Sequence, residues 1–130
     1  EMYTQHVLPL HKRLMQQLDE SGQSERELVI GGDTTPIAGV LPETGADFLL
    51  CDFAADAAGF KNALGNDSSL KVRRNVSPAA LQGGELDPIV DTFTRDLALF
   101  TNPVAGTGIL PYGFEAETLL TFKARVAEER

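Results

Sequence analysis

Residues 28–37, Leu-Val-Ile-Gly-Gly-Asp-Thr-Thr-Pro-Ile, constrain the fold more than any other stretch of this chain. An apolar run stops at two glycines and a helix-start signal follows at once, which predicts a strand that leads into a helix. The side chain of Asp33 or Thr34 can cap the first helical turn. Pro36 suits that turn, because its missing N–H has no helical partner to lose there.

The predicted helix is followed by a second strand. We expect Ile37, Val40 and Leu41 to form the buried face of the helix, which ends near Gly45. A second apolar run begins at Ala46. Strand, helix, glycine turn and strand form one βαβ unit, which implies parallel strands whose carboxyl-terminal loops lie on a common side.

The rest of the chain repeats this alternation of strands and helices. Its apolar spacing predicts one amphipathic helix, ending at Gly22, and then four strand–helix units in a single domain over residues 1–130. A cluster of turn residues occupies 65–69. We expect helices over 3–18, around Phe60, over 86–100 and over 118–127, and further strands over 47–51, 70–75 and 107–110.

Charge and cysteine content bear on the partners of the protein. The 130-residue chain has a net charge of −8, so we expect no nucleic-acid partner, because phosphate binding needs a basic surface. No apolar run approaches the roughly 20 residues of a membrane-spanning helix, and we expect no membrane association. The single cysteine, Cys51, cannot form an intramolecular disulfide, which favours the cytoplasm. The chain does not begin with methionine, and we expect it to be part of a longer protein.

The predicted strand over 70–75 carries cationic side chains, although a buried parallel strand is normally apolar on both faces. Either these cations point into a cavity and bind an anion, or the strand lies at the edge of the sheet and its charges face water. Alternation places Leu70, Val72 and Arg74 on one face and Lys71, Arg73 and Asn75 on the other.

Asp52 directly follows the predicted second strand. Ligands of parallel sheets usually bind at the carboxyl ends of the strands, so its carboxylate can belong to a site. It can equally cap the next turn.

No self-sufficient catalytic motif is present. Gly31 and Gly32 lack the surrounding pattern of a phosphate-binding loop. His6 and His11 lie five residues apart, on different sides of the first helix, which argues against a shared metal. Four βα units form either a small open α/β sheet or half of a barrel, and the short βα loops favour the half-barrel of the (β/α)8 type.

Four segments, in their order and spacing, resemble the carboxy-terminal half of the uroporphyrinogen decarboxylase and corrinoid methyltransferase superfamily. The resemblance implies a (β/α)8 barrel of which this chain supplies the last four units, with the site at the carboxyl ends of the strands. The segments are 29–37, 43–52, 74–78 and 110–114.

The resemblance also implies roles for individual residues. Tyr112 stands where the decarboxylase branch carries a histidine, and it is the catalytic candidate because a phenol can donate a hydrogen bond to a substrate carboxylate. Within the segment 74–78, Asn75 and Pro78 match the corresponding motif of the family. The candidates for substrate binding are Asp33, Asp52, Arg73, Asn75 and Gly113.

The methyltransferase branch binds zinc through side chains that this chain lacks. The matching positions are Val29, Gly31 and Phe114, and none of them can ligate zinc. We therefore expect neither a metal nor another cofactor.

The function implied is decarboxylation of the side-chain carboxylates of a tetrapyrrole. The catalytic aspartate and the arginines of the family belong to the amino-terminal half, so we expect this chain alone to be inactive. One alternative is a relative of the corrinoid-dependent methyltransferases that has lost its zinc, with a corrinoid-type ligand. Another is a non-catalytic half-barrel that forms a homodimer or associates with its missing amino-terminal half.

Overall fold

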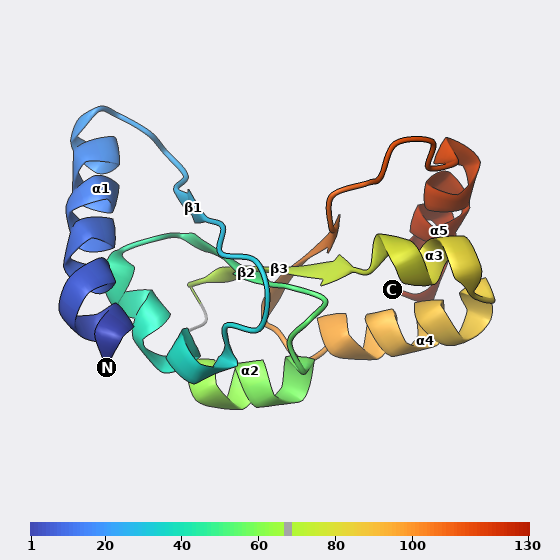
Figure 1. Cartoon of the computed structure of the whole chain (residues 1–130), viewed down its shortest axis with the longest axis horizontal. Helices are drawn as coiled ribbons and strands as arrows, with labels where there is room; N and C mark the ends of the chain where they lie inside the picture. Colours follow the sequence, from blue (N-terminus) through green and yellow to red (C-terminus); the bar gives the residue numbers. More distant parts are fainter. Residues whose placement is uncertain (67–68) are drawn as a thin grey trace.

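The computed structural model of the chain describes residues 1–66 and 69–130 and contains a four-stranded, all-parallel sheet with helices between the strands (Figure 1). The predicted alternation of parallel strands and helices is confirmed. Part of the turn predicted over 65–69 lies outside the described residues. Along the sheet the strands follow their order in the chain: β1 (Glu27–Leu28), β2 (Phe48–Cys51), β3 (Lys71–Val76) and β4 (Asn102–Thr107).

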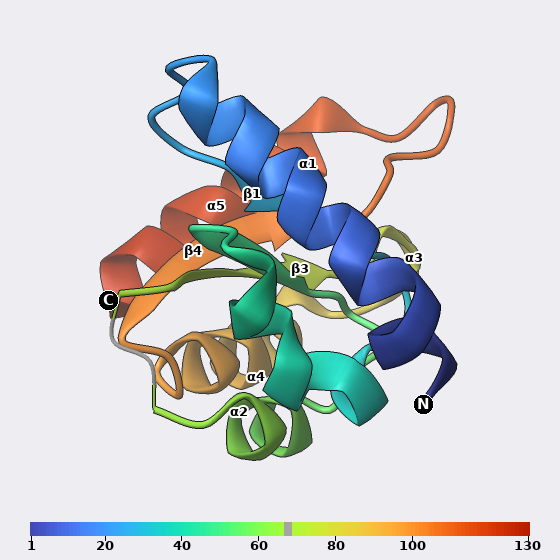
Figure 2. The same ribbon diagram turned by 90° about the vertical axis from the view of Figure 1, so that its left-hand side faces the viewer.

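Three of the helices that connect successive strands lie on one side of the sheet. Figures 1 and 2 both place η2, α2 and α4 below the strands, as right-handed crossovers between neighbouring parallel strands require. The opposite side of the sheet carries none of these three helices. The helical segments are η1 (Tyr3–Val7), α1 (Leu8–Glu20), η2 (Thr35–Thr44), α2 (Ala57–Leu64), α3 (Pro78–Gly83), α4 (Leu86–Leu97) and α5 (Ala116–Glu129).

Two apolar clusters fill the space between sheet and helices. The first joins α1, β2 and α2 through residues such as Met15, Leu49 and Phe60. The second joins α4 to α5, where the rings of Phe93 and Phe122 meet edge to face with centroids 5.2 Å apart. The helix predicted over 86–100 is confirmed as α4, and its residues Val90, Phe93 and Leu97 are all buried.

The strand with cationic side chains lies inside the sheet. β3 pairs with β2 on one side and with β4 on the other. The interpretation of this strand as a charged edge is therefore wrong. Its charges are accommodated because β1 and β4 supply partners for Arg73, and the loop after β2 and helix α4 supply partners for Arg74.

β4 begins five residues before the strand predicted over 107–110. The prediction was wrong because Pro103 and Gly106 are poor strand formers, whereas Ile109, which the pattern favoured, is 98% exposed. Pro103 is tolerated because no further described strand pairs with the far side of β4, so no ladder bond to its nitrogen is lost there. The short helix α3 was also missed, although Ser77 caps it by accepting a hydrogen bond from the Ala80 N–H.

The helix after β1 is a 3-10 helix, and its buried face differs from the predicted one. Ala38, Leu41 and Thr44 are buried, with a spacing of three residues, whereas Ile37 and Val40 are only partly covered. In an α-helix the ring of Pro42 would clash with the Ala38 carbonyl, which favours the tighter helix. The predicted end of this helix is confirmed at the next glycine, whose φ is +81°.

Candidate functional site

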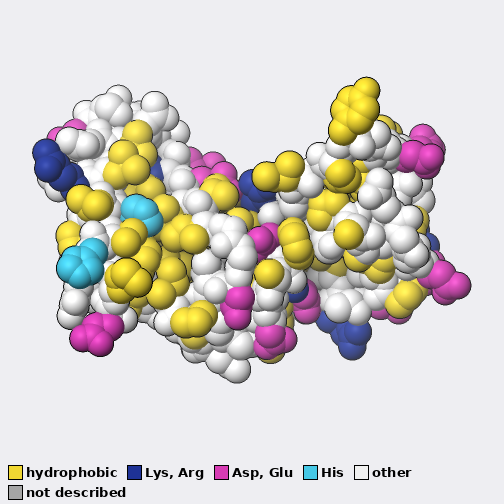
Figure 3. Space-filling model, viewed as in Figure 1, with side chains coloured by type: hydrophobic (Ala, Val, Ile, Leu, Met, Phe, Trp, Pro, Cys, Tyr) yellow, Lys and Arg dark blue, Asp and Glu magenta, His cyan; other side chains and the backbone are white. Residues whose placement is uncertain are grey.

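A hollow of about 430 Å³ lies at the carboxyl ends of the strands. In a parallel sheet this edge gathers the loops that follow all strands, which is why ligand sites form there. Figure 3 shows the upper edge of the molecule indented between the part that carries α1 and the part that carries α3 and α5, with hydrophobic and charged side chains along the indentation. The hollow is lined by Val29, Gly31, Leu50, Asp52, Phe53, Arg73, Asn75, Pro78, Thr107, Gly108 and Ile109.

Asp52 ties three segments together at this edge. Its carboxylate accepts hydrogen bonds from the Gly32 N–H at 2.8 Å, the Phe53 N–H at 2.9 Å and the Asn75 side-chain amide at 3.2 Å. The side chain is only 8% exposed. Asp52 thus fixes the turn after β2 and also holds the loop after β1 against β3. The helix cap of α2 is a different residue, Asp56, whose carboxylate accepts from the Gly59 N–H at 2.7 Å.

Asn75 connects Asp52 to Arg73. Its amide nitrogen donates to Asp52, and its side-chain oxygen accepts from the Arg73 Nε at 3.0 Å. Arg73 also donates from Nη1 to the carboxylate of Glu27 at 3.3 Å and from Nη2 to the carbonyl of Thr107 at 3.4 Å. These bonds form a polar network that reaches all four strands or the loops that follow them. Three of the residues predicted to bind substrate (Asp52, Arg73 and Asn75) lie together in it.

Two glycines of the β4 segment make room for this site. A Cβ on Gly106 would lie 2.5 Å from the Asn75 side-chain oxygen and 2.6 Å from the Arg73 Nε. A Cβ on Gly108 would lie 2.6 Å from the ring of Phe53. Neither glycine is among the site residues predicted from the sequence. A glycine inside a strand often marks a place where other atoms approach the backbone closely. Gly106 gives this indication only when β4 is correctly assigned to Asn102–Thr107.

Arg74 points to the opposite face of β3, where it links the sheet to α4 and to the loop after β2. Its guanidinium pairs with Asp96 on α4 at 2.8 Å, and Nη1 donates to the carbonyls of Asp52 at 2.6 Å and Ala55 at 2.9 Å. Cys51 lies beside it, fully buried. Burial raises the pKa of the Cys51 thiol to about 11, so the protonated thiol is not a nucleophile near neutral pH.

The other predicted site residues lie outside the network. Asp33 is exposed, and its carboxylate accepts from the Thr35 N–H at 3.0 Å; the hydrogen bonds with Thr35 lower the pKa of Asp33. Asp33 is therefore the residue that caps the start of η2, whereas the Thr34 hydroxyl makes no capping bond. Tyr112 is fully exposed on the loop between β4 and α5, and Gly113 follows it with a φ of +80°. No hydrogen bond among the described residues joins Tyr112 to the network.

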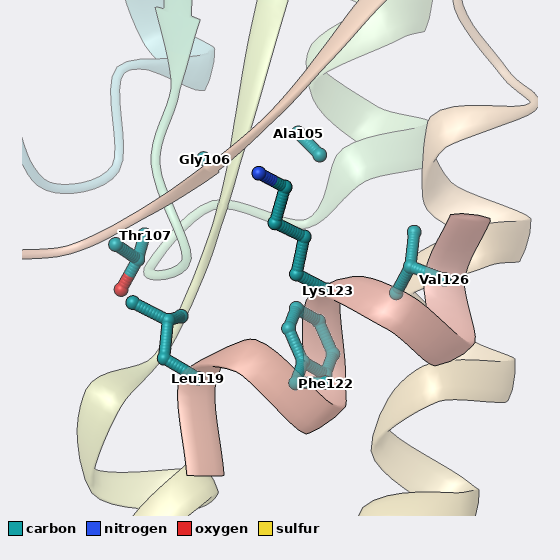
Figure 4. Close-up of a pocket in the computed structure, with 7 residues that line it drawn as sticks. All are labelled: Ala105, Gly106, Thr107, Leu119, Phe122, Lys123 and Val126. Carbon is teal, nitrogen blue, oxygen red and sulfur yellow. The ribbon is translucent and has the colours of Figure 1, made fainter. Parts of the chain in front are cut away.

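A smaller cavity of about 160 Å³ lies between β4 and α5 (Figure 4). Leu119, Phe122 and Val126 give it an almost wholly apolar lining, and the Lys123 stem extends along it toward Ala105 and Gly106. This cavity offers few polar groups to orient a ligand. The hollow at the strand ends is the better candidate site.

Neither a metal cluster nor a membrane-spanning helix appears in the described residues. Within 1–66 and 69–130, no three histidine, cysteine, aspartate or glutamate side chains are grouped closely enough to hold a metal ion. The helices of these same ranges are all too short or too polar to span a lipid bilayer. No protein-family model matches this chain, and comparison with curated proteins gives no significant match.

Proposed function

We propose that this chain is the carboxy-terminal half of a (β/α)8 barrel enzyme similar to uroporphyrinogen decarboxylase. In this proposal the hollow at the strand ends binds a side-chain carboxylate of a tetrapyrrole. The observation that carries the proposal is the sequential order of the four parallel strands with η2, α2 and α4 on one side. Barrels are built in this way, whereas a doubly wound sheet reverses its strand order and carries helices on both faces.

Arg73 is the proposed carboxylate-binding group. Its guanidinium lines the hollow, its side chain is 32% exposed, and Asn75 fixes its Nε. A guanidinium held in one plane is suited to a carboxylate because both present two atoms in matching geometry. Asn75, only 5% exposed, is a positioning residue in this scheme, and Asp52 anchors Asn75 in turn.

Tyr112 is the proposed hydrogen-bond donor to the substrate. It lies three residues beyond Ile109, which lines the hollow, on the same loop. Decarboxylation breaks the bond between the methylene carbon and the carboxylate, releases carbon dioxide, and requires a proton at that carbon. We assign supply of that proton to the amino-terminal half, so the chain by itself binds substrate without turning it over.

A second candidate function is association without catalysis. Val29, Phe53 and Ile109 are exposed apolar residues around the hollow, and the outer side of β4 pairs with no other described strand. Unpaired strand edges and exposed apolar side chains both favour association with another chain. A homodimer or a complex with the amino-terminal half would use these surfaces.

The proposal is tested by ligand binding to the 130-residue chain. Titration with uroporphyrin, the stable oxidised form, measures the dissociation constant, and incubation with uroporphyrinogen measures carbon dioxide release. We expect binding, no release, and about tenfold weaker binding by R73Q, which corresponds to about 1.4 kcal/mol.

The matched control is R95Q, because Arg95 is an exposed arginine on α4. We expect it to bind uroporphyrin as the unmodified chain does. Absence of binding, or equal weakening by R73Q and R95Q, refutes the carboxylate site. Turnover of uroporphyrinogen by the chain alone refutes the proposal that the amino-terminal half supplies the proton.

A further inference from the structure

We infer that Glu27 is an internal competitor for the carboxylate-binding guanidinium of Arg73. Its own carboxylate bonds to a nitrogen that a substrate carboxylate would use, so binding exchanges one carboxylate for another. The inference rests on the proposed function, because it assumes that Arg73 receives a carboxylate. Glu27, which is not among the site residues predicted from the sequence, would thereby regulate that site.

The three contacts of Arg73 differ in strength. The Nε bond to Asn75 is 3.0 Å long and lies within one strand, two residues apart, so it anchors the guanidinium plane. The terminal nitrogens make single, longer contacts, at 3.3 Å to Glu27 and 3.4 Å to the Thr107 carbonyl. A bidentate carboxylate on arginine reaches about 2.7–2.9 Å. The terminal nitrogens are therefore the part of Arg73 whose contacts an incoming carboxylate can improve.

The position of Glu27 allows its carboxylate to release Arg73. It lies on β1, which has only two residues and pairs on one side with β2 among the described strands. Its side chain is 33% exposed, so its carboxylate can turn to water without being stranded in an apolar interior. An ion pair of this exposure contributes about 0.2–1 kcal/mol. Release of Glu27 from Arg73 therefore costs little free energy, but the cost is large enough to change the measured affinity for a carboxylate.

The exchange favours ligands with several carboxylates. A monocarboxylate replaces the Arg73–Glu27 pair with one similar pair and gains little. A ligand with further carboxylates keeps its other contacts while one group takes the place of Glu27. The site therefore discriminates against single small acids, which are the commonest competing anions.

A neighbouring ion pair provides a matched control. Glu25 pairs with Lys71, at the start of β3, and lies two residues before Glu27. E25Q and E27Q remove the same charge from positions two residues apart, but only E27Q releases Arg73. A general change in electrostatic potential affects both variants, whereas competition at Arg73 affects one.

The test measures binding of propane-1,2,3-tricarboxylate to the 130-residue chain by calorimetry, and follows the Arg73 Nε–H signal by NMR. We expect E27Q to bind about three- to fivefold more tightly than the unmodified chain, E25Q to stay within about twofold, and R73Q to lose binding. E27A is a second variant, in case the glutamine still bonds to Arg73; it is expected to match or exceed E27Q.

The outcomes separate the two proposals. If E27Q, E27A and E25Q all bind like the unmodified chain while R73Q loses binding, the competition is refuted and the carboxylate site stands. If E25Q and E27Q gain affinity equally, the effect is general electrostatics and the competition is again refuted. If no variant binds the tricarboxylate and the Arg73 signal does not move, the carboxylate site fails and the competition fails with it.

Discussion

Gly106 should be the position in the sheet least tolerant of a single added methyl group. Alanine there would place Cβ 2.5 Å from the Asn75 side-chain oxygen, 2.6 Å from the Arg73 Nε and 2.9 Å from the Arg73 Cγ. None of these atoms is the free end of a long side chain. The substitution G106A must therefore move both side chains and break the bond between them.

The magnitude follows from three contributions. Forcing a methyl group into filled space costs about 1–3 kcal/mol, and the lost Asn75–Arg73 hydrogen bond costs about 0.5–1.5 kcal/mol. Alanine recovers about 0.5–1 kcal/mol relative to glycine, because it restricts the unfolded chain. The net expectation for G106A is a loss of about 0.5–4 kcal/mol in the free energy of unfolding, with a central value of about 2 kcal/mol.

Urea unfolding followed by circular dichroism measures this loss. At about 1–3 kcal/mol per molar urea, a destabilisation of about 2 kcal/mol lowers the midpoint by about 1 M. The control is G83A at the end of α3, where an added Cβ meets nothing within 4 Å and where we expect equal or slightly higher stability. If G106A is as stable as G83A and binds carboxylates normally, the reasoning about the site geometry is wrong.

Three further predictions concern the supports of the site. R74L should cost about 3–5 kcal/mol in urea unfolding, because it leaves the Asp96 carboxylate without its partner. D47N should reduce the loss of thermal stability as the pH falls below about 5. Hydrogen bonds from Arg26 lower the pKa of Asp47, so its stabilising contribution is present above the unfolded value and is lost as the pH falls through the lowered one. Cys51 should resist an aromatic disulfide reagent at about pH 8 and react promptly in urea, because burial keeps its thiol protonated and covered.

Each of these predictions has a control and a contradicting result. R95Q removes an exposed arginine and should change stability little, so equal losses in R74L and R95Q would contradict a structural role for Arg74. D91N removes an exposed carboxylate on α4, and an acid profile identical to that of D47N would contradict the Arg26 pairing. Rapid modification of the folded chain would contradict the burial of Cys51.

The parts of the fold that the sequence predicts well are those fixed by local periodicity. On α4 the buried residues Val90, Phe93 and Leu97 follow the helical spacing, and nothing distant is needed to read it. The alternation of β3 likewise separates Arg73 from Arg74 correctly. Where local preference and final structure conflict, prediction fails. The Pro103–Gly106 segment of β4 has poor strand propensity and is held extended by pairing with β3.

The site itself depends on strand register, which local patterns do not contain. Asp52 bonds to a backbone N–H 20 residues earlier and to an amide 23 residues later. Glu27 and Arg73 are 46 residues apart. The sequence indicates that Asp52, Arg73 and Asn75 belong near strand ends, but only the order of the strands brings them into contact. The loop with Tyr112 has no such constraint, and its position could not be derived from periodicity.

Arg73 and Arg74 show why one strand can serve both the core and the site. Adjacent residues of a strand face opposite sides of the sheet. Arg74 is only 9% exposed, and each of its contacts to Asp96, Asp52 and Ala55 is 3.0 Å or shorter. Arg73 is more exposed and has one short contact and two longer ones. The short contacts of Arg74 make it a structural link between the sheet and α4. The terminal nitrogens of Arg73 make only longer contacts, so they can exchange partners more easily. Loss of stability is therefore the expected signature of changes at Arg74, whereas under the proposed function loss of carboxylate affinity is the expected signature of changes at Arg73.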